Sequence, residues 1–241
     1  MPDHRVHFAD PAAVASYAAS AVRQVPGLSD LHRMTALLLA EHAPTSAQVL
    51  VVGAGGGLEL AAMAAAQPGW HFTGVDPASA MLEVARAATA AHAQRVHLVT
   101  GTVDQAPEGP FDGATCLLTL HFMDRVERLH VLQAMHRRLR PGARLVVAHH
   151  APPGPDAARW MARSAAYAQG VLADPARAAT AGRSMTERLP LLTPADDEDL
   201  LRAAGFEDVA LFYAAFSFRG WVATSRQSSA RPPSSLGGTV A

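Results

Sequence analysis

The chain has 241 residues, of which 49% are apolar and 17% charged, and its formal net charge is -1. This length suffices for a large domain with a buried core, and the balanced charge gives no long-range field that would attract nucleic acid or an acidic membrane. A single cysteine, Cys116, excludes an internal disulfide, and the absence of lysine excludes Schiff-base chemistry and a Walker A loop.

The first 45 residues are predicted to form a helical cap, with helices over 11–24 and 29–42 separated by a Pro-Gly pair. Short apolar runs then alternate with helical patterns, which indicates a parallel sheet covered on both faces. We expect Ser79 to cap one of these helices. The predicted strands are 48–52, 71–75, 95–99, 113–120 and 144–148, and the predicted helices are 58–67, 79–91 and 124–139.

Residues 151–192 interrupt this alternation and are predicted to be a helical insertion over the sheet. A further helix is expected over 193–204, with Thr193 as its N-cap, Pro194 at its first position and Gly205 after its end. Two strands, 207–216 and 218–224, then indicate an antiparallel hairpin at the sheet edge. The Ser/Pro/Gly-rich segment 225–241 is predicted to be a disordered tail.

The most informative motif is Gly53-Ala54-Gly55-Gly56-Gly57, which connects a predicted strand to a predicted helix. Its glycines fall at positions 1, 3 and 5, whereas a dinucleotide fingerprint has them at 1, 3 and 6, so the spacing disfavours NAD or FAD. The next strand ends in Asp76, whose carboxylate is placed to accept both ribose hydroxyls of an adenosine. The pair of features predicts a ligand of the adenosine type.

The order and spacing of the motifs from 49 to 150 resemble those of the class I S-adenosylmethionine-dependent methyltransferases. Besides the glycine motif, the chain offers Gly74-Val75-Asp76-Pro77, Gly101-Thr102-Val103, Phe111-Asp112 and Arg140-Pro141-Gly142-Ala143. The resemblance implies an α/β, Rossmann-like fold: a seven-stranded, mostly parallel sheet with a reversed last strand. The methyltransferase domain would span 46–224, with the insertion 151–192 as its lid.

The same resemblance implies which residues contact the cofactor, S-adenosyl-L-methionine. The chain departs from the family pattern at Val51, where strand one usually carries an acid, and at Thr102, which often is an acid too. Both departures remove hydrogen-bond acceptors. The implied cofactor contacts are Gly53, Ala54, Gly55, Asp76, Pro77, Met81, Thr102, Val103, Leu117 and Leu118.

Three histidines follow predicted strands at the end of the sheet where open parallel sheets bind ligands. His121 follows the fourth strand, and His149 and His150 follow the fifth. Each is a candidate general base, because imidazole titrates near neutral pH. Adjacent residues of a strand point to opposite faces, so at most one of His149 and His150 is expected to face the pocket.

The candidate substrate residues come from the N-terminal helices and the insertion. Aromatic rings stabilise a sulfonium through cation–π contact, and arginine can bind a carboxylate through two hydrogen bonds. We expect no metal site, because Glu127 and His130 lack the second such pair that a carboxylate-bridged site needs. The substrate candidates are Tyr17, Arg159, Trp160, Arg163 and Tyr167.

The sequence therefore predicts methyl transfer to a small-molecule acceptor. Two alternatives stay open: an enzyme that modifies the cofactor, suggested by a weaker resemblance to the carboxy-S-adenosylmethionine synthases, and a binding protein without catalysis. Nucleic acid is a disfavoured substrate, and the apolar hairpin near Phe212–Trp221 could support a homodimer. With neither a signal-peptide pattern nor an apolar run of membrane-spanning length, we expect a cytoplasmic protein.

Overall fold

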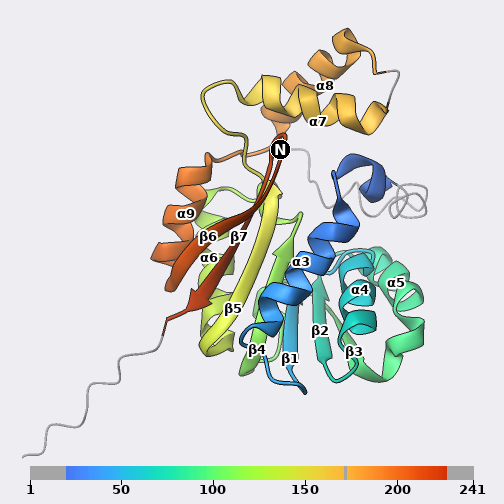
Figure 1. Cartoon of the computed structure of the whole chain (residues 1–241), viewed down its shortest axis with the longest axis vertical. Coiled ribbons are helices and arrows are strands. Elements are labelled where there is room, and N and C mark those ends of the chain that lie inside the picture. The colour runs from blue at the N-terminus through green and yellow to red at the C-terminus, as the bar shows by residue number, and fades with distance from the viewer. Residues whose placement is uncertain (1–19, 171–172, 227–241) are drawn as a thin grey trace, which may run out of the picture.

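The structure, a computed structural model, describes residues 20–170 and 173–226. Its centre is a seven-stranded sheet in the order β3-β2-β1-β4-β5-β7-β6. β7 runs antiparallel to both of its neighbours, whereas the pairs among β1 to β5 are parallel. The predicted fold class is confirmed (Figure 1). The strands are β1 (Gln48–Val52), β2 (His71–Asp76), β3 (Val96–Thr100), β4 (Phe111–Leu117), β5 (Leu139–His150), β6 (Phe206–Ala215) and β7 (Phe218–Ser225).

Helices cover both faces of the sheet, and a helical hairpin stands beyond one end of it (Figure 1). α3, α4 and α5 pack on one face, and α6 and α9 pack on the other. The hairpin consists of α7 and α8. The helices are α3 (Leu28–Ala40), α4 (Leu58–Ala66), α5 (Ser79–Ala88), α6 (Arg125–Arg138), α7 (Ala157–Gln169), α8 (Pro175–Arg188) and α9 (Pro194–Ala203), with 3-10 turns η1 (Ala90–Arg95), η2 (Val103–Gln105) and η3 (Leu120–Phe122).

The central strand β1 shows why the chain folds in this way. After its first residue, every position is apolar and buried, because the strand lies between two helical layers. Val49 and Val51 belong to the core under α3 and α4, and Leu50 and Val52 belong to the core under α6 and α9. Burying each such side chain stabilises the fold by about 1.5–3 kcal/mol.

The predicted fourth strand, 113–120, ends at Leu117 because the chain turns into η3 from Leu120. Two further local predictions were wrong, each for a physical reason. Ser79 is the first helical residue of α5 rather than its cap, because the Asp76 carboxylate accepts a hydrogen bond from the Ala78 amide and Ala78 stays extended. β5 begins at Leu139, earlier than predicted, because that residue pairs with Phe111 of β4. By contrast, Thr193 caps α9 as predicted.

The predicted cap, lid and tail are described only in part. Residues 20–24 and α3 are helical, as expected for the cap, and α7 and α8 form the predicted insertion. Ser225 still belongs to β7, and residues 227–241 of the predicted tail lie outside the described residues. The domain boundaries themselves stay predictions. None of the helices in the described part of the chain has the length and apolarity needed to cross a membrane.

A buried ion network fastens α9 to the sheet. The Arg128 guanidinium, fully buried on α6, donates to Asp197 Oδ1 at 2.7 Å and to the Pro190 carbonyl oxygen at 2.8 Å. His149 Nε2 of β5 lies 3.0 Å from Asp197 Oδ2. Burial acts to raise the pKa of Asp197, but His149 and Arg128 together hold it below its ordinary value. A charged Asp197 therefore belongs to the folded state.

We expect Asp197→Asn to lower the free energy of unfolding by about 3 kcal/mol or more, because it leaves the buried Arg128 charge without a counter-ion. Urea denaturation at pH 7 measures this loss. The matched control is Asp199→Asn on the same helix, where the exposed pair with Arg202 contributes less than about 1 kcal/mol. Equal losses in the two variants would show that the network does not hold α9.

Candidate functional site

The loop between β1 and α4 turns sharply over the end of β2. Gly53 and Gly55 have φ angles of 74° and 47°, values that favour glycine. The amides of Gly53 and Ala54 donate to the Val75 carbonyl oxygen at 2.9 and 3.0 Å. A Cβ atom on Gly53 would overlap with the side chain of Thr119, which follows β4. The loop therefore fits closely against the ends of two neighbouring strands.

Asp76 joins this loop to the ends of β2 and β3. Its Oδ2 accepts a hydrogen bond from the Gly55 amide at 2.9 Å, and its Oδ1 accepts one from the Ala78 amide at 2.9 Å. Its carbonyl oxygen accepts a hydrogen bond from the Gly101 amide at 3.0 Å. Burial raises the pKa of Asp76, and the two amide donors act against that rise. The carboxylate is therefore fixed in direction, and it remains partly exposed.

The other predicted cofactor contacts lie at or after the carboxyl ends of the strands, on the same side of the molecule as Asp76. Thr102 caps η2 and forms a reciprocal capping box with Gln105, so its hydroxyl is engaged locally. Leu118 comes directly after β4 and adopts a left-handed φ of 57°. The structure thus gathers this group around the ends of β2, β3 and β4. Its members are Pro77, Met81, Thr102, Val103, Leu117 and Leu118.

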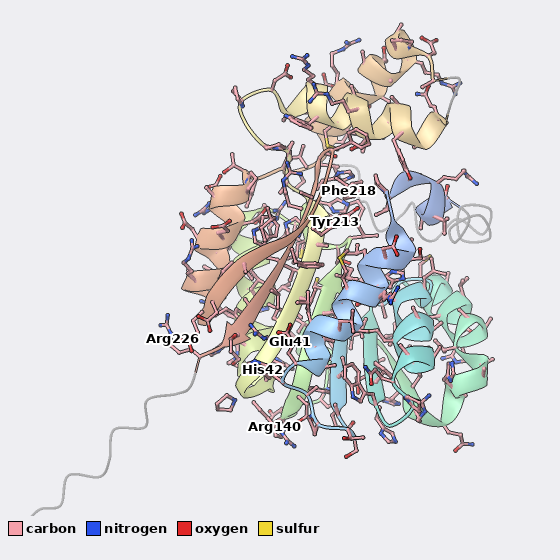
Figure 2. The ribbon with its side chains drawn as sticks, viewed as in Figure 1. Glu41, His42, Arg140, Tyr213, Phe218 and Arg226 are labelled. Carbon is pink, nitrogen blue, oxygen red and sulfur yellow. The ribbon has the colours of Figure 1, made fainter. Side chains whose placement is uncertain are left out.

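His121 and His150 meet at the ends of β4 and β5, with ring centroids 4.9 Å apart. His150 stacks on Phe218 at 3.9 Å, and its Nδ1 lies 2.8 Å from the Ser217 hydroxyl. Burial, and then the neighbouring His149, lower the pKa of His150 to about 3. Figure 2 places Phe218 toward the α7 end of the sheet and Arg140 at the opposite end. The histidine pair therefore lies at the same end of the sheet as the α7–α8 hairpin.

His149 does not join this pair. Its ring lies against Trp221 and beside Asp197, within the ion network under α9. Only His150 of the two adjacent histidines approaches His121, in keeping with the expected alternation along the strand.

The insertion places four candidate substrate residues on α7. The Arg163 guanidinium lies 4.2 Å from the Trp160 ring centroid, and Arg219 of β7 approaches the same ring at 6.0 Å. Tyr167 lies 5.8 Å from Phe216, and both rings are partly exposed. Arg159 also belongs to this helix. The remaining candidate, Tyr17, lies outside the described residues.

Sequence reasoning missed three buried polar residues. Ser164 of α7 and Ser217 of the β6–β7 turn have hydroxyl oxygens 2.6 Å apart, which links the lid to His150. No local pattern could reveal that contact. Glu59 of α4 is buried behind the glycine loop. It is the one charged residue in the otherwise apolar segment Leu58–Ala66, and this pattern in the sequence indicates a special role for it.

Comparisons with known proteins agree with this geometry. Residues 50–145 match the family model described as a methyltransferase domain. These residues form a methyltransferase domain. They contain the glycine loop, Asp76 and His121, so the family predicted from the sequence is confirmed for this part of the chain. No curated protein matches the sequence.

Three solved structures share the fold of the methyltransferase domain and its surroundings. An assigned O-methyltransferase from Nostoc punctiforme has 23% identity and a TM-score of 0.65, over 92% of this chain and 61% of its own. Human N-acetylserotonin methyltransferase, in complex with S-adenosylmethionine, has 14% identity and a TM-score of 0.60, over 94% and 60%. An O-methyltransferase family 2 protein from Planctomyces limnophilus, in complex with apigenin, has 16% identity and a TM-score of 0.57, over 82% and 61%. The chain thus spans about three fifths of each.

We expect Gly53→Ala to destabilise the protein more than Gly142→Ala does. Both glycines have left-handed φ angles, 74° and 79°, but the added methyl group overlaps with Thr119 only at Gly53 and meets nothing within 4 Å at Gly142. The overlap should cost an additional 1–3 kcal/mol or so. Chemical denaturation of both variants measures the difference, and equal losses would contradict the close fit of the loop.

Proposed function

We propose that the chain transfers a methyl group from S-adenosyl-L-methionine to a small-molecule acceptor. The observation that carries this proposal is the fixed Asp76 carboxylate beside the glycine loop, within a methyltransferase domain. Two structural neighbours support it through their ligands, which are S-adenosylmethionine in one and the small molecule apigenin in the other.

The residues present fit this cofactor. Each oxygen of Asp76 accepts one amide hydrogen bond and retains a lone pair, so the carboxylate can also accept the two ribose hydroxyls. Gly53 has no room for a side chain because Thr119 packs against it, which holds the loop backbone close to the end of β4. The apolar Met81, Val103 and Leu117 suit the flat faces of an adenine. Thr102, in contrast, uses its hydroxyl in its own capping box.

The mechanism needs little covalent chemistry from the protein. S-adenosylmethionine supplies an electrophilic methyl group on a sulfonium, and displacement is in line. The chain's task is to hold the acceptor in contact with that group and exclude water. We assign to His121 the role of general base, which removes the proton from the acceptor. His150 is a poor base because its pKa is lowered, and its ring is stacked on Phe218. His150 then positions His121 through their edge contact.

We assign acceptor binding to the α7 side of the site. Trp160, Arg163 and Tyr167 offer aromatic and cationic groups there, and Arg159 is a further candidate. Homodimerisation through the hairpin stays a prediction. Within Phe212–Trp221, Tyr213, Phe218 and Trp221 are buried, whereas Phe216 is 39% exposed. A cytoplasmic location likewise stays a prediction.

We expect Asp76→Ala to weaken S-adenosylmethionine binding about 100-fold, because two hydrogen bonds to a charged group are lost. Isothermal titration calorimetry measures the affinity, and Asp199→Ala, an exposed acid on α9, is the control. An unchanged affinity would disprove the assigned site. Mass spectrometry of the wild-type reaction then separates the alternatives: a methylated acceptor supports the proposal, a carboxylated cofactor indicates the synthase, and binding without turnover indicates a binding protein.

We expect His121→Gln to lower kcat by about 10²–10⁴-fold for an acceptor that must lose a proton, with cofactor affinity unchanged. The control is His71→Gln, because His71 is exposed at the start of β2, at the opposite end of that strand from Asp76. Steady-state kinetics across pH 6 to 9 provide the measurement. If His121→Gln kept the wild-type kcat, the assignment of His121 as the general base would be wrong.

A further inference from the structure

Glu59 is a buried acid that the fold alone does not explain. It lies in the first turn of α4, two residues after the glycine loop, and is 7% exposed. Its Oε1 has no hydrogen-bond partner among the described residues. An isolated ionised carboxylate is very costly in such a place. Burial accordingly raises the pKa of Glu59 to about 8, and the nearby Thr115 hydroxyl only partly offsets this.

The contacts of Glu59 place its carboxyl group beneath the glycine loop. Thr115 of β4 lies beside it, and Thr115 pairs in register with Val51 of β1. Its charge also acts on Cys116, whose thiol interacts with the Thr119 side chain, the same side chain that packs against Gly53. Glu59 is therefore next to the position at which strand one, with Val51, lacks an acid.

No cation within the described residues neutralises this carboxyl. The Thr115 hydroxyl is the neighbouring side chain that lowers its pKa, and burial together with the charge of Glu59 raises the pKa of Cys116. The buried His32 of α3, packed against α4, has its pKa lowered to about 4 by burial alone, so it stays neutral at pH 7. On β2, the pKa of Asp76 responds to burial and to two amides. The buried acid is therefore neutral at pH 7, and a cation bound beside it would favour its ionised form.

We propose that Glu59 is the counter-ion of the cofactor's α-ammonium group: a neutral acid in the free protein, it loses its proton to solvent on binding and becomes the carboxylate that faces the ammonium. This inference rests on the proposed function. It assigns to the helix the role that strand one, with Val51, cannot perform. The carboxyl lies at the positive end of α4, which also favours the ionised form once a cation is present.

Proton release on binding tests this directly. Calorimetric titration at pH 6.5, in buffers of different ionisation enthalpy, counts the protons that leave per ligand bound; the pH is kept low because an α-amino group itself titrates near 8. With S-adenosylhomocysteine we expect close to one proton released by the wild-type protein and none by Glu59→Gln. The variant should also bind about tenfold more weakly. With 5′-methylthioadenosine, which lacks the amino-acid end, both proteins should release none and bind equally.

The controls separate this role from a structural one. Glu83→Gln, an exposed acid on α5, should behave as wild type. Glu59→Gln should gain stability relative to wild type as the pH rises from 5 to 8, because only the wild type has an acid that must stay protonated when buried.

A wild-type protein that releases no proton with S-adenosylhomocysteine, or that releases one with 5′-methylthioadenosine too, overturns the inference without any variant. Unchanged affinity and proton count in Glu59→Gln also overturn it. A wild-type protein that binds neither ligand instead disproves the proposed function.

Discussion

The site depends on one carboxylate that is bonded before any ligand arrives. Asp76 accepts amide hydrogen bonds from Gly55 and Ala78, so it fixes the glycine loop and the start of α5 relative to each other. These bonds also restrict the carboxylate's own direction. A ligand that uses it does not have to order it first, and a preorganised group loses less entropy on binding. The segments that follow β1, β2 and β3 therefore all bond to one residue, Asp76, through its carboxylate and its carbonyl oxygen.

The elements that could be predicted from the sequence are those whose cause is local. The strand–glycine–helix segment and the acid at the end of β2 follow from residue types at fixed spacing. Thr193 and Pro194 specified the start of α9 because a cap acts within one turn. The order of the strands followed from the resemblance, since short-range patterns do not say which strands become neighbours.

The parts that could not be predicted depend on contacts distant in sequence. Ala78, and not Ser79, is the N-cap of α5, because the Asp76 carboxylate accepts a hydrogen bond from the Ala78 amide. The separation of His149 from His150 was expected, but which of them faces the site depends on Asp197 and Ser217, from segments about 50 to 70 residues away. Glu59 belongs to α4, and only the packing of that helix on the sheet brings it beside Thr115 and the Val51 position.

The close contact between α7 and α8 has a consequence for how this protein can diversify. Gly182 of α8 leaves no space for a Cβ, because the Ala158 carbonyl oxygen and the Ala162 backbone approach it directly. The hairpin is thus an internally packed module, and it contacts the β6–β7 region through Ser164–Ser217, Tyr167–Phe216 and Trp160–Arg219. Under the proposed assignment of acceptor binding to α7, substitutions on the hairpin would change which acceptor is admitted while the sheet keeps its stability. On that assignment, acceptor choice and cofactor binding would evolve separately.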